Sequence, residues 1–189
     1  MCLKPIVQAV LDLLPSSAST KEQEFRLVYL GTATYDKEEP FQLQTEAYQK
    51  MGNCRVINLQ VSEAMDSSQI PTKEELRSTL LSAHVILVSG GNTLYAIRRW
   101  QELGIDAMIQ EAVETNDSSP ILCGGSAGAI CWFASGHSDS MDPTTCLHVD
   151  PNLTEEQKKD WRYIRYVFIC LLEFECCRAL QVRCVLIHP

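Results

Sequence analysis

The chain has 189 residues, of which 46% are hydrophobic and 21% charged, and this balance is ordinary for one globular domain. Its formal net charge of −8 gives no general attraction to nucleic-acid phosphates or anionic membrane surfaces, so we expect neither partner. The nine cysteines are an odd number and no cleavable apolar leader precedes them, which favours reduced thiols in a cytoplasmic protein. The apolar runs are too short or too charged to predict a transmembrane segment.

An amphipathic helix is predicted over residues 3–14. Its apolar side chains fall on one stripe at helical spacing, and they are Ile6, Val7, Val10, Leu11 and Leu14. Residues 15–23 are rich in Ser, Thr and charged side chains, without apolar periodicity, and this composition predicts a surface connection.

Beyond this connection, short apolar runs typical of buried strands alternate with amphipathic helices. The expected strands are 26–30, 54–61, 84–88 and 120–123. The expected helices are 41–51, 72–81, 92–103 and 106–115, the second of them opening on Thr72 and Glu75 at capping-box spacing. This alternation predicts an α/β three-layer sandwich, with a mostly parallel sheet and helices on both faces. Active residues then gather at the carboxyl ends of the strands.

One glycine-rich turn lies at such a strand end. Gly124, Ser126 and Gly128 form a Gly-x-Ser-x-Gly sequence directly after strand 120–123 and before a helix-compatible run, which is the context of a nucleophile elbow. Glycines are required there because a β-carbon would collide with the neighbouring strand and helix. We therefore expect the Ser126 hydroxyl to stand clear of the sheet, at the positive end of the following helix.

Two backbone amides are candidates for an oxyanion hole beside Ser126. The elbow itself positions the amide of Ala127, and the glycine turn after strand 84–88 brings the amide of Gly91 to the same sheet edge. A glycine turn that binds phosphate, or that only packs a helix close to a strand, would give the same pentapeptide. Two glycine turns on successive strand ends favour the catalytic interpretation.

Three stretches together resemble the peptidase E group of aspartyl dipeptidases, which are serine peptidases with a class I glutamine amidotransferase-like, or flavodoxin-like, fold. The stretches are LVYLGTAT at 27–34, ILVSGGNTLYAIRRW at 86–100 and GGSAGAICWFASGHSDS at 124–140. The resemblance implies an intracellular serine hydrolase that removes N-terminal Asp from small Asp-X peptide substrates and needs no metal or cofactor. By the same resemblance Ser126 is the nucleophile, and the amides of Gly91 and Ala127 form the oxyanion hole.

The resemblance also implies an acidic triad member a little over a dozen residues past the serine. This points to Asp139 in the polar GHSDS loop, with Asp142 as second choice. The family's histidine follows a glycine-rich strand in a Pro-His-aromatic context, whereas this chain continues from Arg165 with YVFICLLEF. The later histidine here is His188, before the terminal proline, and it is the candidate base although its context differs.

The other histidines have simpler interpretations. His137 in the GHSDS loop and His148 in an acidic stretch are typical of solvated surface residues, and His84 at the start of a strand is typical of a structural one. A cysteine nucleophile at Cys123 is a further alternative, because related amidotransferases use a cysteine at the elbow. It lies three positions before the serine, inside the strand, which disfavours it.

Residues 1–165 are expected to form a partial α/β domain of this family, followed by a divergent tail over 166–189 of unclear structure. An edge strand or a helix docked on the sheet is the simplest expectation for that tail. Family members begin with an additional strand and continue with further strands, so the resemblance implies a chain incomplete at both ends. The competing function is therefore an inactive homologue that binds a ligand or partner, with homodimerisation through open sheet edges.

Overall fold

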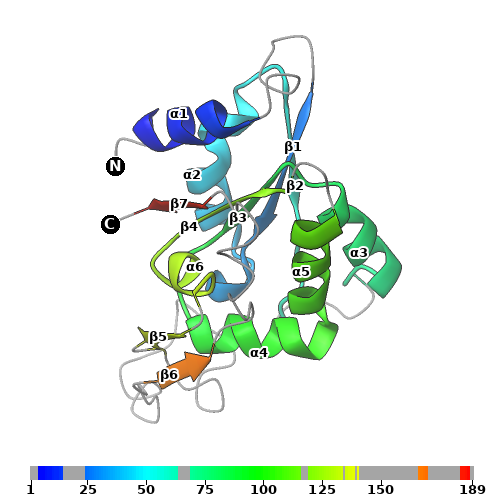
Figure 1. The fold of residues 1–189 in the computed structure, drawn as a ribbon, viewed down its shortest axis with the longest axis vertical. Helices are drawn as coiled ribbons and strands as arrows, with labels where there is room; N and C mark the ends of the chain where they lie inside the picture. Colours follow the sequence, from blue (N-terminus) through cyan, green and yellow to red (C-terminus); the bar gives the residue numbers. More distant parts are fainter. Residues whose placement is uncertain are drawn as a thin grey trace.

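The computed structural model describes residues 4–14, 24–63, 69–115, 119–133, 135–138, 140, 166–169 and 184–187. Its main sheet contains five parallel strands in the order β2-β1-β3-β4-β7 (Figure 1). These strands are β1 (Phe25–Leu30), β2 (Cys54–Asn58), β3 (Val85–Val88), β4 (Ile121–Gly125) and β7 (Cys184–Ile187). The chain runs outward from β1 to β2 and then returns to the other side of β1 with β3. The carboxyl ends of β1 and β3 thus form the topological switch point, where doubly wound folds place their sites.

Helices cover both faces of this sheet (Figure 1). One face is covered by α1 (Lys4–Leu13) and α2 (Glu38–Gln49). The other is covered by α3 (Lys73–Leu81), α4 (Thr93–Leu103) and α5 (Ile105–Thr115). The short helices η1 (Thr32–Thr34) and α6 (Ala127–Ile130) follow the carboxyl ends of β1 and β4. The predicted three-layer α/β sandwich is confirmed.

Alternation along the central strands divides the core into two layers. Phe25, Leu27 and Tyr29 of β1 pack toward α1 and α2, whereas Val28 and Leu30 pack toward α3, α4 and α5. All five side chains are fully buried. A strand buried on both faces needs apolar residues at successive positions, which explains why these strands read as continuous apolar runs.

Most predicted elements occur close to their expected bounds. The capping box at the start of α3 is present, since the Thr72 hydroxyl accepts the Glu75 N–H and the Glu75 carboxylate accepts the Thr72 N–H. Helix α2 begins three residues before the predicted 41–51, and β2 ends at Asn58 rather than at residue 61.

One strand pairing lay outside the prediction, and another agrees with the edge strand that was one of the two expectations for the tail. β5 (Ser135–Ser138) pairs antiparallel with β6 (Tyr166–Ile169), although the GHSDS segment was expected to be a loop. β7, within the tail, extends the main sheet beside β4, as an edge strand would. No helix in the described ranges has the length and apolar character that crossing a bilayer requires.

Candidate active site

Ser126 lies at the junction of β4 and α6 with a backbone conformation that side-chain-bearing residues rarely adopt. Its φ is 54° and its ψ is −119°, and the residue is exposed. The Ser126 carbonyl accepts the N–H groups of Ala129 at 2.9 Å and Ile130 at 3.0 Å, so the first turn of α6 is built on it. A non-glycine residue held at positive φ stores strain, and such residues concentrate at functional sites.

The two glycines of the Gly-x-Ser-x-Gly sequence are required by close backbone approaches. A β-carbon on Gly124 would lie 2.2 Å from the carbonyl oxygen of Gly128, and one on Gly128 would lie 2.2 Å from the carbonyl oxygen of Val88. Neither backbone oxygen can move without disturbing β3 or α6. The strand-to-helix turn is therefore as tight as the sequence predicts for an elbow.

The glycine turn after β3 lies directly beside Ser126. A β-carbon on Gly90 would be 3.4 Å from the β-carbon of Ser126 and 4.0 Å from its hydroxyl oxygen. Gly91 has a φ of 124°, and a β-carbon there would lie 2.2 Å from the carbonyl oxygen of Ala33. The turns that follow β1, β3 and β4 are thus in mutual contact.

The amides predicted to form the oxyanion hole, those of Gly91 and Ala127, belong to these touching turns. Among the described residues, neither amide N–H has a hydrogen-bond acceptor. Behind the turns, Ala33, Ala96 and Ala127 form a small buried cluster. Small side chains there allow η1, α4 and α6 to approach one another closely.

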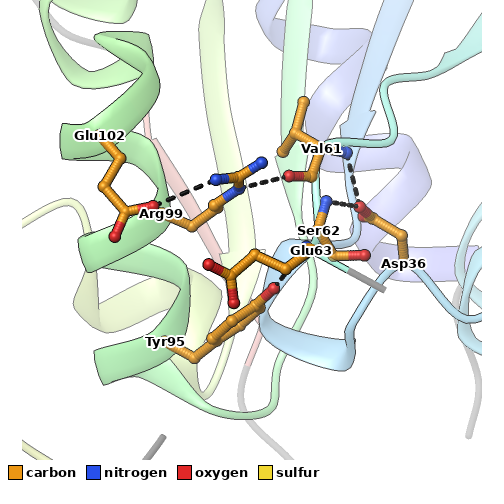
Figure 2. A network of polar contacts seen from close by, with 7 residues as sticks. All are labelled: Asp36, Val61, Ser62, Glu63, Tyr95, Arg99 and Glu102. Atoms are coloured by element: carbon orange, nitrogen blue, oxygen red, sulfur yellow. Dashed lines mark hydrogen bonds and ion pairs between the residues drawn. The ribbon is translucent and has the colours of Figure 1, made fainter. Parts of the chain in front are cut away.

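The turn after β1 contains two further strained residues, which the sequence interpretation did not single out. Tyr35 and Asp36 have φ values of 57° and 54°. The Asp36 side chain reaches the loop that follows β2, where its Oδ2 accepts the N–H groups of Val61 and Ser62, each at 2.6 Å (Figure 2). Asp36 is only 5% exposed. Burial raises the pKa of its carboxyl above the ordinary 3.8, and the bonds from Ser62 and Val61 oppose that shift in part.

Tyr29 lies between Asp36 and the hydroxyl groups of Ser89 and Thr34. Tyr29 Oη, Asp36 Oδ1 and Ser89 Oγ are all buried. Burial raises the pKa of Tyr29 to about 12, so its phenol is protonated at neutral pH.

Asn92 connects the turn after β1 to the start of α4. Its backbone N–H donates to the Ala33 carbonyl at 2.7 Å, and its side-chain nitrogen donates to Tyr35 Oη at 3.0 Å. Its side-chain oxygen accepts the N–H of Tyr95 at 3.1 Å, which caps the helix. Deeper in the interior, the Trp100 indole N–H donates to Thr32 Oγ1 at 2.9 Å. The Gly91 turn is therefore held by the turn after β1 as well as by its own helix.

The predicted triad partners Asp139, with its second choice Asp142, and His188 lie outside the described residues, as does the histidine expected at the surface, His148. The two neighbours of Asp139 are described. The Ser140 hydroxyl accepts the N–H of Leu94 at 3.2 Å, and the Ser138 hydroxyl lies 3.1 Å from Thr93 Oγ1. The chain on both sides of Asp139 consequently lies against the first turn of α4, close in sequence to Gly91.

The remaining candidates are placed as follows. His84 precedes β3 at the amino edge of the sheet, opposite Ser126, and its Nδ1 accepts the Arg26 N–H at 3.1 Å, which is a structural role. His137 lies in β5 rather than in a loop. Cys123 is fully buried inside β4, within the core layer facing α1 and α2, which argues against a nucleophilic thiol. In the described part of the chain, no cluster of three or more His, Cys, Asp or Glu side chains could hold a metal ion.

Comparisons with known proteins give the family of this chain. The family model for peptidase family S51 matches residues 4–151. The uncharacterized peptidase YgaJ of Bacillus subtilis (strain 168) is 33% identical over 128 residues, which are 68% of this chain and 51% of that protein. The chain thus spans about half the length of this relative.

A solved structure matches in fold. The crystal structure of a peptidase E candidate from Listeria monocytogenes EGD-e superposes with a TM-score of 0.51 and 17% sequence identity, covering 95% of this chain and 85% of that one. At this identity the match supports the fold alone. The family match covers the strand-end turns, the serine turn and the segment around Asp139. This chain belongs to peptidase family S51.

Proposed function

We propose that this chain is a serine peptidase that hydrolyses Asp-X dipeptides, with Ser126 as the nucleophile. The observation that carries the proposal is the exposed Ser126 at φ 54°, in contact with the glycine turn that presents the Gly91 amide. An exposed hydroxyl on a strained turn, beside two amide N–H groups that donate to no acceptor among the described residues, is suited to acyl transfer.

The reaction would follow the usual course of serine hydrolysis. A base takes the Ser126 proton, and the oxygen attacks the carbonyl carbon of the N-terminal residue. The amides of Gly91 and Ala127 donate to the resulting oxyanion. Collapse of the intermediate breaks the peptide bond, and the protonated base delivers its proton to the departing amine. Water then hydrolyses the ester on Ser126 and releases the N-terminal amino acid.

The proposal keeps His188 as the base and Asp139 as the group that orients it. What supports Asp139 is the placement of its neighbours, since Ser138 and Ser140 lie against Thr93 and Leu94 at the start of α4. The preference for an N-terminal Asp rests on the family resemblance.

The test is release of free Asp from Asp-Leu, measured for the purified chain and for Ser126→Ala. Ser78→Ala, an exposed serine on α3, is the matched control. We expect turnover by the parent chain and by the control, with a loss on the order of 10⁴-fold or more in Ser126→Ala. A serine-reactive phosphonofluoridate should add one adduct, detected by intact mass, to the parent and not to Ser126→Ala. Equal turnover by the parent and Ser126→Ala would exclude the proposal.

A second candidate is a homologue that binds a peptide without cleaving it. One observation favours it: after Arg165 the sequence continues with YVFICLLEF, where the family resemblance implies a glycine-rich strand and a Pro-His-aromatic context for the base. Equilibrium binding of Asp-Leu by calorimetry, with neither product release nor phosphonofluoridate adduct, would establish this alternative.

A further inference from the structure

The Asp36 side chain joins two loops at the carboxyl edge of the sheet. Its Oδ2 accepts both the Val61 and the Ser62 N–H (Figure 2), and the backbone carbonyls of Tyr35 and Asp36 are also bonded to residues that follow β2. The Ser62 hydroxyl donates to the Tyr35 carbonyl at 3.2 Å, and the Gln60 side-chain nitrogen donates to the Asp36 carbonyl at 3.4 Å. These bonds hold Tyr35 and Asp36 in their left-handed conformations, which would otherwise be unfavourable.

The loop after β2 is in turn fixed to α4. Arg99 Nε donates to the Val61 carbonyl at 2.7 Å, and the Tyr95 hydroxyl accepts the Glu63 N–H at 2.8 Å (Figure 2). Asp36 is therefore connected, through the loop after β2, to α4, the helix that begins directly after Gly91 and Asn92.

A second, shorter connection runs through Tyr35 and Ala33. Tyr35 Oη accepts a hydrogen bond from the Asn92 side chain, and its ring packs against Tyr95 with centroids 4.5 Å apart. The Ala33 carbonyl oxygen accepts the Asn92 N–H at 2.7 Å and lies 2.2 Å from the position that a Gly91 β-carbon would take. The position of the turn after β1 thus sets the position of the Gly91 peptide.

From these contacts we infer that Asp36 is a positioning residue for the Gly91 amide, acting through the turn Gly31–Asp36 and Asn92. The inference rests on the proposed function, in which this amide stabilises the oxyanion. A buried carboxylate that bonds two backbone amides also costs desolvation, and a role in holding a strained turn accounts for its presence there. It predicts that loss of the Asp36 contacts weakens transition-state stabilisation rather than substrate binding.

The decisive variants are Asp36→Ala and Asp36→Asn. An asparagine oxygen can accept the Val61 and Ser62 N–H groups in place of Oδ2, whereas alanine cannot. We expect Asp36→Ala to lower kcat for Asp-Leu on the order of 10²-fold with little change in KM, and Asp36→Asn to restore most of it. Arg77→Ala, which removes the hydrogen bonds between Arg77 and Glu111 that join α3 to α5, is the control for general destabilisation and should leave kcat unchanged. Equal kcat in Asp36→Ala and the parent would overturn the inference.

A readout independent of activity separates this inference from the proposed function. The Asn92 N–H bonds the Ala33 carbonyl, so its amide hydrogen exchange reports directly on the contact between the two turns. Exchange at Asn92 should accelerate in Asp36→Ala and remain slow in Asp36→Asn and Arg77→Ala. If the parent shows no turnover, the proposed function fails, and unchanged exchange at Asn92 in Asp36→Ala would then overturn the inference by itself.

A milder variant covers the case in which Asp36→Ala does not fold. Tyr35→Phe keeps the ring against Tyr95 and removes the hydroxyl that accepts the Asn92 bond. We expect faster exchange at Asn92 and a several-fold lower kcat with KM retained. Parent-like exchange together with parent-like kcat would contradict the inference.

Discussion

A β-carbon placed on Gly90 would lie 3.4 Å from the β-carbon of Ser126, so the space between the turn after β3 and the serine is no wider than one methyl group. The two residues come from adjacent parallel strands, paired as Val88 with Gly124. The parallel register brings both glycine-rich turns to one point at the carboxyl edge of the sheet. A side chain added at Gly90 would therefore contact the serine turn and not the hydrophobic core.

We predict that Gly90→Ala lowers kcat for Asp-Leu by about tenfold while the free energy of unfolding falls by less than about 1 kcal/mol. The new methyl group would also be 3.3 Å from the Gly125 carbonyl, so the serine turn must shift by a few tenths of an ångström. Gly52→Ala is the matched control, because no atom lies within 4 Å of a β-carbon at Gly52. Enzyme kinetics and urea unfolding curves are measured for both variants. Parent-like kinetics in Gly90→Ala would show that the space beside Gly90 does not affect the serine.

We predict that Gly128→Ala is destabilising by about 2–3 kcal/mol or prevents folding. Its methyl group would lie 2.2 Å from the Val88 carbonyl oxygen and 2.8 Å from that of Ser89, and neither backbone atom can move without displacing the end of β3. The measurement is the urea midpoint at constant m value, again compared with Gly52→Ala. A midpoint equal to that of Gly52→Ala would mean that the elbow is looser than the structure describes.

The serine turn could be predicted from sequence because everything that defines it is local. A buried strand, two glycines and a serine stand within a few residues of one another, and parallel-sheet topology places the turn after β3 beside them. The positive φ of Ser126 and the close approach of Gly128 to Val88 follow from that arrangement.

Asp36 could not be predicted in the same way, because its environment is made by distant residues. Its two amide donors, Val61 and Ser62, lie 25 and 26 positions later, and only the pairing of β1 with β2 brings them to it. In the sequence, Asp36 precedes Lys37 and Glu38 and is indistinguishable from a solvated charge. β5 was missed for a related reason, since the Ser-Gly-His-Ser segment has no apolar alternation and its pairing with β6 supplies the strand geometry.

We predict that Asp36→Asn stabilises the chain relative to the parent, and more so as pH rises. Burial raises the folded-state pKa of Asp36, so the folded state holds this proton more tightly than the unfolded state does. The contribution of Asp36 to stability is therefore fully present below the ordinary pKa of 3.8 and is lost as pH rises through the folded pKa. The difference in free energy of unfolding between Asp36→Asn and the parent should grow over that window and become constant above it.

Urea unfolding of both proteins at several pH values between about 4 and 8 checks this prediction. Glu38→Gln, an exposed carboxylate in the first turn of α2, is the control, and its difference from the parent should show no comparable rise. A difference for Asp36→Asn that decreased with pH would mean that the bonds from Val61 and Ser62 outweigh the desolvation of the carboxylate.

We predict the opposite pH trend for His84, at the other edge of the sheet. Burial, together with the nearby Arg26 charge, lowers the folded-state pKa of His84, and its Nδ1 must stay unprotonated to accept the Arg26 N–H at 3.1 Å. The stability contributed by neutral His84 is fully present above the ordinary pKa of 6.5 and is lost as pH falls through the folded pKa.

The parent should therefore lose its stability advantage over His84→Ala as pH is lowered below about 6.5. The measurement is the difference in urea midpoint between the two proteins from pH 8 downward, at fixed ionic strength. The kinetic consequence is separable, because His84 lies at the amino edge of the sheet and Ser126 at the carboxyl edge. Under conditions where both proteins are folded, His84→Ala should retain the parent's kcat for Asp-Leu and its pH profile. A lower kcat in His84→Ala would contradict this prediction, because it would mean that the His84 imidazole takes part in the reaction.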